Sequence, residues 1–296
     1  MTTGNGSDQA TLEYTMRYNP PMDLAVAERN LKEAKQILDQ LGVVFLLHSG
    51  VCLGATRDNS FIQWDDDIDL ISVLGVNGLT EQSTDIVATA FRDKGYFVDV
   101  TEGAYSKTVV TIKKFIRLSW DCAHIIDDSI YVYPRVKLPA GLFTNPKEIE
   151  FLGEKFLVPN PTEEYLRLKY GAEWMVPKKA GEYEMDVVGK VPATDLVGLP
   201  CKLQVLDHEG KPVPNAEVIL VGGGRYRTDE LGYAEITLPG PDWYALVIRY
   251  PGHEQVLYME QMEPGKAYVY KSDTATNEAN STSGEIGTLG NILLPA

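Results

Sequence analysis

Residues 64–70 read Trp-Asp-Asp-Asp-Ile-Asp-Leu, and this stretch decides the fold of the N-terminal part of the chain. Successive side chains of a strand point to opposite faces. Asp65, Asp67 and Asp69 therefore share one face if the strand begins early enough, while the apolar residues between them point into the core. Carboxylates this close repel one another, and a divalent cation relieves that repulsion. The acidic run, residues 65–69, therefore predicts a strand that carries a Mg²⁺ site.

A second interpretation of the acidic run is an exposed loop or an Asp-rich helix start, because runs of charge are usually solvated. A calcium loop of the EF-hand type fits the acidic run less well, because its Gly and Glu spacing is missing. The sequence upstream favours the metal site. Residues 49–57 read Ser-Gly-Val-Cys-Leu-Gly-Ala-Thr-Arg after an apolar run at 43–47. A strand followed by glycine at a helix start can present backbone N–H groups to a phosphate.

The periodicity around this region predicts an α+β or α/β domain. Apolar residues recur at steps of three and four from Leu24 to Leu41, and Gly42 suits a helix C-terminus. The elements predicted after this helix are, in chain order, a strand at 43–47, a helix at 50–57, a strand at 67–73, a helix at 80–94, strands from 96 to 136, one strand at 149–158 and a helix from 161 to 171.

The chain divides into four predicted segments. Residues 1–21 are a flexible N-terminal segment, and residues 22–195 are the main domain, ending in a linker or wrapping segment at 173–197. Residues 196–271 show short strand patterns between turn signals, which is typical of a small β-sandwich. Residues 272–296 are rich in Ser, Thr, Asn and Gly, so we expect a disordered tail.

The composition of the chain argues against several classes of function. The 296 residues are 44% hydrophobic and carry a formal net charge of −15, so we expect a soluble protein that binds no nucleic acid non-specifically. Three distant cysteines, Cys52, Cys122 and Cys201, match neither a zinc site nor a disulfide framework. We expect no signal peptide and no membrane span. Together these features predict a cytoplasmic location.

The region from Gly50 to Leu70 resembles the signature of the LicD/fukutin family. Its shared residues are Gly50, Leu53, Gly54, Ala55, Arg57, Phe61, Ile62, Trp64 and the acidic run. The similarity continues through residues 149–153, 158–160 and 164–177 and so covers most of residues 40–178. One departure is Val51, where the family has a hydroxyl residue; Ser49 or backbone N–H groups would have to substitute for it.

The resemblance implies a nucleotidyltransferase-like core, a mixed sheet with flanking helices. It implies transfer of a phospho-alcohol, such as phosphocholine, ribitol phosphate or glycerol phosphate, from a CDP-linked donor to a glycan hydroxyl. Asp67 and Asp69 fall on the pair that binds Mg²⁺ or Mn²⁺, with Asp65 as the leading acid of the motif. The third carboxylate is assigned to Asp121 as metal ligand and catalytic base; its rivals, residues 127–128, suit a turn better.

The predicted substrate-binding residues are Ser49, Gly50, Gly54, Arg57, Asp65 and Arg117. For Arg57, a phosphate contact and a salt bridge to the acidic run are both open. His48 is expected to be packed rather than catalytic. Other functions also fit the sequence: a nucleotidyltransferase with an NTP donor, a glycosyltransferase with a sugar nucleotide, or an inactive module that binds nucleotide or glycan.

The segment after residue 196 resembles carboxypeptidase-regulatory-like and transthyretin-like sandwiches. The similarity rests on Lys-Pro-Val-Pro-Asn-Ala-Glu-Val at 211–218 and Thr-Asp-Glu-Leu-Gly-Tyr-Ala at 228–234. Neither stretch contains a catalytic constellation, so we expect this domain to bind glycan, to mediate assembly or to stabilise the protein.

Overall fold

The computed structural model describes residues 5–179, 182–194, 196–272 and 293–296. The chain forms two compact units. Unit 1 comprises Met1–Val132 and Lys137–Tyr183, and unit 2 comprises Tyr133–Val136 and Glu184–Ala296.

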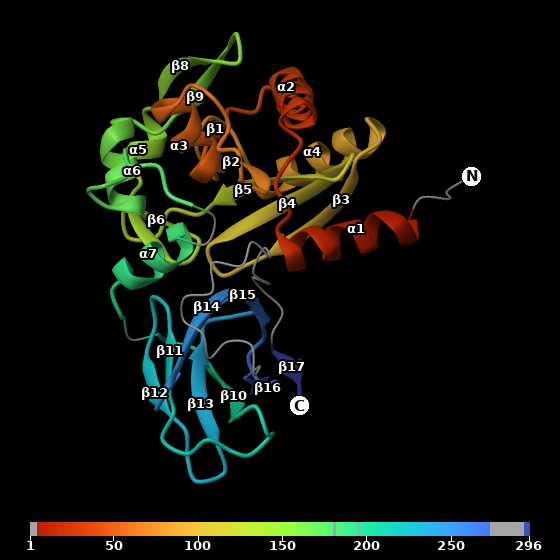
Figure 1. Ribbon diagram of the computed structural model, residues 1–296. Helices are drawn as coiled ribbons and strands as arrows, with labels where there is room; N and C mark the ends of the chain where they lie inside the picture. The colour runs from red at the N-terminus through yellow and green to blue at the C-terminus, as the bar shows by residue number, and fades with distance from the viewer. Residues whose placement is uncertain (1–4, 180–181, 195, 273–292) are drawn as a thin grey trace. The chain divides into compact units, whose positions relative to one another are not determined.

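Unit 1 is built on a five-stranded mixed sheet with the order β1-β2-β5-β4-β3 (Figure 1). The strands are β1 (Leu46–Leu47), β2 (Asp67–Val73), β3 (Phe97–Glu102), β4 (Ser106–Lys113) and β5 (Ile116–Ala123). β2 and β5 pair in parallel, whereas the other neighbours pair antiparallel. The predicted strand at 67–73 and the mixed sheet with flanking helices are confirmed. The apolar run at 43–47 forms only the short β1.

Helices α2 (Leu24–Gln40) and α4 (Glu81–Asp93) form where periodicity predicts them. The Asp23 carboxylate caps α2 by accepting the N–H groups of its first turn, and Gly42 follows its end with φ +68°. Thr80 and Ser83 form a reciprocal capping box at the start of α4. α2 and α4 contact one another, and α4 packs against β3 and β4.

Helix α1 (Asn5–Tyr18) occupies most of the segment predicted to be flexible, and that prediction is wrong for these residues. Leu12 packs into a cluster with Val110 and Ile112 of β4. Figure 1 shows α1 along β3 and β4, on the side away from α4. The polar sequence of α1 carries few apolar side chains, so its helical state depends on this tertiary packing rather than on a clear amphipathic pattern.

The rest of unit 1 consists of short elements around the sheet. They are α3 (Ser49–Arg57), β6 (Ser129–Val132), β7 (Val136–Pro139), α5 (Gly141–Thr144), β8 (Lys147–Phe151), β9 (Glu154–Val158) and α6 (Thr162–Tyr170). The single strand predicted at 149–158 is wrong, because β8 and β9 form an antiparallel hairpin. Leu152 and Gly153 turn the chain with φ +53° and +75°. α7 (Glu182–Lys190) lies in the stretch predicted as a linker, and most of it belongs to unit 2.

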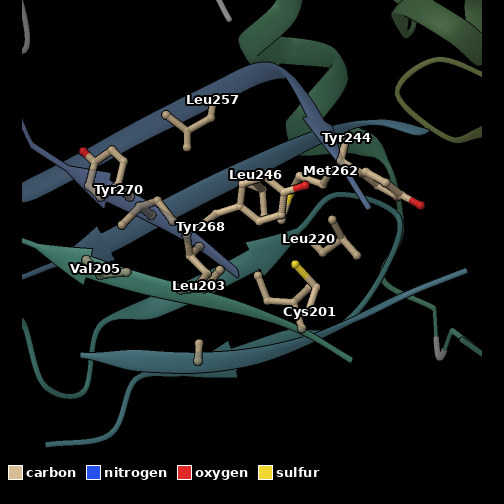
Figure 2. Close-up of a cluster of buried hydrophobic side chains, with 14 of the residues drawn as sticks. Cys201, Leu203, Val205, Leu220, Tyr244, Leu246, Leu257, Met262, Tyr268 and Tyr270 are labelled. Atoms are coloured by element: carbon tan, nitrogen blue, oxygen red, sulfur yellow. The ribbon is translucent and has the colours of Figure 1, made fainter. Parts of the chain in front are cut away.

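Unit 2 contains two four-stranded sheets, ordered β13-β10-β16-β17 and β12-β11-β14-β15. The strands are β10 (Leu199–Leu206), β11 (Glu217–Leu220), β12 (Arg225–Arg227), β13 (Tyr233–Leu238), β14 (Asp242–Tyr250), β15 (His253–Met262), β16 (Ala267–Lys271) and β17 (Leu294–Pro295). Leu203 and Val205 of β10 share a buried core with Leu246 and Leu257 from the second sheet (Figure 2). The predicted sandwich architecture is therefore present.

The predicted disordered tail at 272–296 falls mostly outside the described residues, which omit 273–292. Its last residues depart from the prediction, because β17 pairs antiparallel with β16. The N–H of Leu293 also donates to Glu260 Oε2 at 3.2 Å. Among the described residues, no helix is both long enough and apolar enough to cross a membrane.

Candidate functional site

The parallel pairing of β2 and β5 places the predicted acids on one face of the sheet. Asp67 lies opposite Arg117, Asp69 opposite Ser119, and Asp121 opposite Ile71. Because residues two apart on a strand share a face, Asp67, Asp69 and Asp121 all project from the same side, which we call the acid face. Burial raises the pKa of Asp69 well above its ordinary value, and the charges of Asp67 and Asp121 raise it further. The structure therefore places the three predicted acids on one face, whereas the carboxylate oxygens that lie within 4.8 Å of one another are those of Asp65, Asp66 and Asp67.

Asp65 lies in the turn before β2, because the strand begins only at Asp67. Burial raises the pKa of Asp65 well above its ordinary value, and the charge of Asp67 adds to this. Its Oδ2 atom is buried without a hydrogen-bond partner. Carboxylate oxygens of Asp65, Asp66 and Asp67 lie within 4.8 Å of one another. Alternation along a strand thus does not account for Asp65, which reaches the acids from the turn.

These residues fit a hard divalent cation such as Mg²⁺. The donor set consists of carboxylate oxygens, which such cations prefer. The unpartnered Asp65 Oδ2 is the kind of buried acceptor that a cation would satisfy. The mutual repulsion of Asp65, Asp67 and Asp69 is also a strain that a dication would relieve.

Gly50 makes room for Asp65 at the start of α3. A Cβ added to Gly50 would lie 2.3 Å from Asp65 Oδ2, which is closer than real Cβ atoms approach oxygen. Glycine therefore lets the carboxylate approach the first turn of α3.

We expect Gly50→Ala to displace the Asp65 carboxylate and to destabilise the fold by about 1–3 kcal/mol through overpacking. Thermal denaturation measures the loss. Gly141→Ala in α5 is the matched control, since a Cβ there meets nothing within 4 Å. Equal stability of the two variants would contradict this role for Gly50.

Arg117 is the buried cation of the acid face, with 4% of its surface exposed. Its Nε and Nη2 donate to Asp67 Oδ2 at 3.0 and 2.8 Å, and Nη2 also donates to Asp66 Oδ2. The charges of Asp67 and Asp66 raise the pKa of Arg117 despite its burial. The sequence predicts Arg117 as a substrate ligand, but the structure places it as the ion-pair partner that holds two acids.

Ser49 begins α3 in a left-handed conformation with φ +44°, which is uncommon for a residue with a side chain. Its N–H donates to the Tyr165 hydroxyl at 2.9 Å. That hydroxyl also lies within hydrogen-bond distance of His48 Nδ1, at 2.8 Å. Burial lowers the pKa of His48 well below its ordinary value, so the ring stays neutral. His48 is packed, with 2% of its surface exposed.

Lys169 of α6 is a site residue that the sequence reasoning missed. It is 7% exposed, and its Nζ donates to Ser49 Oγ. Burial lowers the pKa of Lys169, while the charges of Asp69 and Asp121 act in the opposite direction. A signal was present in the sequence: Lys169 lies four residues after Tyr165, on the same helix face. A lysine on the apolar face of a helix requires a buried anion or acceptor.

Two other predicted substrate-binding residues, Arg57 and Gly54, make different contacts. Arg57 donates to Asp58 Oδ2 at 2.9 Å from Nε and 2.6 Å from Nη2, so its described salt bridge is to its neighbour rather than to the acidic run. A Cβ on Gly54 would lie 2.4 Å from the Ser60 carbonyl oxygen, so this glycine serves close chain packing. Val51 is 1% exposed. Residues 127–128 form the predicted turn, with φ +48° and +56°.

Comparison with known proteins agrees with this geometry. Residues 42–161 match the family described as LicD/FKTN/FKRP, nucleotidyltransferase domain. The resemblance to the LicD/fukutin family is therefore confirmed, and the matched region contains the acidic run and β5. The chain is also 27% identical over 174 residues to Ribitol 5-phosphate transferase FKRP of Homo sapiens and to the protein of the same name of Mus musculus.

The aligned region covers 53% of this chain but only 34% of each of these relatives. The chain thus matches about a third of the length of the curated relatives. The activity stated in the names of these relatives is therefore carried to this chain only as a proposal.

Proposed function

We propose that the protein transfers a phospho-alcohol from a CDP-linked donor to a glycan hydroxyl, using a nucleotidyltransferase-like core and Mg²⁺ or Mn²⁺ held at the acid face. The observation that carries this proposal is the placement of Asp67, Asp69 and Asp121 on one face of the sheet, next to a cluster of Asp65, Asp66 and Asp67 in which Asp65 Oδ2 is buried without a hydrogen-bond partner. Family membership of residues 42–161 supports the class of reaction.

The proposed ligands of the cation are Asp67, Asp69 and Asp121, with Asp65 beside them. When bound, a divalent cation supplies charge neutralisation at the phosphate oxygens and orients them. The protein itself supplies the carboxylate ligands. Arg117 orients Asp67 through two hydrogen bonds.

The proposed chemistry is an in-line displacement at phosphorus. The acceptor hydroxyl oxygen forms a bond to the β-phosphorus, and the bond from that phosphorus to the bridging oxygen breaks, so CMP leaves with that oxygen. The hydroxyl proton passes to a carboxylate acting as general base, which we assign to Asp121. Thr108 Oγ1 donates to Asp121 Oδ1 at 2.6 Å and so orients that carboxylate.

The donor phosphates are proposed to lie at the start of α3. Backbone N–H groups at a helix N-terminus bind anions, and Gly50 lets a ligand approach them closely. Ser49 lies at this end of α3 with its hydroxyl directed to Lys169. Ser49 thereby takes the place of the family hydroxyl that Val51 lacks.

The proposal also covers the transferred group, the acceptor and the cellular location. Ribitol 5-phosphate is the first transferred group to test, since it appears in the names of the relatives. The proposed acceptor is a glycan or a cell-surface polysaccharide precursor. The described free thiols of Cys52, Cys122 and Cys201 are all buried, which suits the proposed reducing, cytoplasmic location.

A donor panel tests the proposed function. The metal-free protein is incubated with CDP-ribitol, CDP-glycerol or CDP-choline, with or without Mg²⁺ or Mn²⁺, and CMP release is followed by chromatography. We expect release that requires the metal and is faster with one of these donors than with the others. EDTA should abolish it.

Other outcomes of the same panel identify the rival functions. Pyrophosphate release from NTPs would assign a nucleotidyltransferase that moves NMP, and UDP release from UDP-sugars would assign a glycosyltransferase. Binding of CDP ligands without turnover, over a panel of glycan acceptors, would assign an inactive recognition module. Any of these three results would overturn the proposed reaction.

A further inference from the structure

Helix α1 packs on the same face of the sheet as the acids. Leu12 of α1 shares a buried cluster with Val110 and Ile112 of β4. In the register of β4 and β5, Val110 lies opposite Ser119 and Ile112 opposite Arg117. Because directly opposite residues of paired strands point to the same side, both apolar residues belong to the acid face. α1 therefore covers the part of the acid face that β3 and β4 form (Figure 1).

The segment that follows α1, residues 19–22, is attached to the turn before β2, residues 62–66. We call this segment the strap. Asn19 has a left-handed φ of +40°. With its amide nitrogen turned toward both acceptors, it donates to Asp66 Oδ2 at 3.0 Å and to the Thr15 carbonyl oxygen at 3.1 Å. The Met22 N–H donates to the Asp65 carbonyl oxygen at 2.8 Å. The strap thus holds both a side chain and the backbone of the turn.

A second distant segment holds the same turn through Trp64. The indole Nε1 of Trp64 donates at 2.9 Å to the carbonyl oxygen of Lys178, 114 positions away. Within the turn, the Asp65 N–H donates to the Ile62 carbonyl oxygen at 3.1 Å. Backbone groups outside helices and sheets depend on partners of this kind, so these contacts decide how rigid the turn is.

Asp66 is the residue at which the strap and the sheet meet. Its Oδ2 accepts from Asn19 on the strap and from Arg117 Nη2 on β5, and its side chain is 26% exposed. Hydrogen bonds to an ionised carboxylate are stronger than those between neutral groups. The neighbours of Asp66 in the sequence are Asp65 and Asp67, which belong to the acids of the proposed metal site. Holding Asp66 therefore also sets the direction of the carboxylates on either side of it.

We propose that Asn19 is a positioning residue of the metal site. Through its hydrogen bond to Asp66, the strap fixes the turn so that Asp65 and Asp67 present their carboxylates to the cation. Trp64 holds the turn from the other direction. The effect on cation binding rests on the proposed function, whereas the rigidity of the turn is a property of the metal-free protein. Loss of a group that orients metal ligands typically lowers metal affinity about 10–100-fold.

Hydrogen exchange tests the rigidity of the turn without a metal. Asn19→Gly removes the amide and keeps the backbone conformation, because glycine adopts a left-handed φ without strain. Asn77→Gly is the matched control, since Asn77 is exposed and has a φ of +51°. Exchange in the full chain is followed in EDTA by mass spectrometry. Peptides covering residues 62–67 should exchange about fivefold faster or more in Asn19→Gly, because a hydrogen bond to a charged group is lost. They should not change in Asn77→Gly.

A metal titration tests the positioning of the ligands. Mn²⁺ is titrated by calorimetry into the full, metal-free chain without any donor. We expect Asn19→Gly to bind Mn²⁺ about tenfold more weakly or worse, and Asn77→Gly to bind it like the unmodified chain. Trp64→Phe keeps an aromatic ring but loses the Nε1 donor, so it should weaken Mn²⁺ binding in the same direction. Trp243→Phe on β14 of unit 2 is its control.

Two results would overturn the role of Asn19. One is equal exchange at the turn, or equal Mn²⁺ affinity, in the two glycine variants. The other is a loss of affinity in Asn19→Gly together with faster exchange throughout unit 1, because Asn19 would then support the fold as a whole and not the turn. Thermal denaturation should show similar stability for the two glycine variants, since each loses an asparagine side chain at a left-handed position.

The two experiments separate this inference from the proposed function. If the unmodified chain binds no Mn²⁺ but exchange at the turn still rises in Asn19→Gly, the metal-dependent function fails and the strap still holds the turn. If the unmodified chain binds Mn²⁺ and Asn19→Gly binds it equally well, the function stands and the positioning role of Asn19 falls.

Discussion

Asp69→Asn will abolish transfer while leaving the metal-free protein at least as stable as the unmodified chain. We expect activity to fall by about 10³-fold or more, because the proposed cation, which would stabilise charge in the transition state, loses a ligand. Stability moves the other way because burial, Asp67 and Asp121 raise the pKa of Asp69 in the folded state. Asparagine removes a charge that the metal-free fold accommodates at a cost.

Because of Asp69, the stability of the metal-free protein should also depend on pH. In the unfolded chain Asp69 titrates near its ordinary pKa, whereas the folded state binds the proton more tightly. The stability of the metal-free protein therefore falls as the pH rises from the unfolded pKa toward the raised folded pKa. This slope should be shallower in Asp69→Asn, and saturating Mg²⁺ should flatten it in the unmodified chain.

Thermal denaturation in EDTA at several pH values, together with CMP release, measures both effects. The control is Asp85→Asn on α4, where the side chain is 69% exposed and pairs with Lys107. This variant should keep both activity and slope. An Asp69→Asn protein with activity within tenfold of the unmodified chain would remove Asp69 from the metal site.

Arg117→Met will be the most destabilising single substitution on the acid face. It leaves the half-buried carboxylates of Asp66 and Asp67 next to one another without their guanidinium partner. Removing one member of a buried ion pair typically costs about 3–5 kcal/mol. Mg²⁺ should recover part of this loss, because a bound dication again supplies positive charge to the acids.

Chemical denaturation with and without Mg²⁺ measures the loss and its recovery. Arg249→Met is the control, because the Arg249 side chain is 41% exposed and pairs with Glu254 at the surface of unit 2. Such exposed pairs contribute at most about 1 kcal/mol. A loss in Arg117→Met no larger than that of the control would show that solvent, not Arg117, compensates the acids.

Local signals in the sequence predicted the elements that carry the acids. The strand at 67–73 and the helices at 24–41 and 80–94 form because their periodicity, caps and following glycines agree. Alternation on β5 placed Asp121 on the same face as Arg117. The grouping of Asp67, Asp69 and Asp121 was therefore predictable once β2 and β5 were expected to be neighbours.

The missed features depend on contacts between distant residues. Nothing local marks Arg117 as the partner of Asp67, since the pair is created by the parallel register of β2 and β5. Lys169 reaches Ser49 across a separation of 120 positions. Helix α1 was missed for a related reason: its packing against β4, rather than its propensity, accounts for the helix. The turn at residues 152–153 was missed although Gly153 is a local turn signal.

The parallel pairing of β2 and β5 also bears on how the chain folds. Between these strands lie α4 and the β3–β4 hairpin, so the pairing joins residues 50 positions apart. Such non-local pairing forms slowly, because loop-closure entropy is lost before native contacts compensate for it. We therefore expect the acids of β2 and β5 to come together late in folding. Substitutions that weaken the β4–β5 hairpin should slow assembly of the acid face even where they touch none of its side chains.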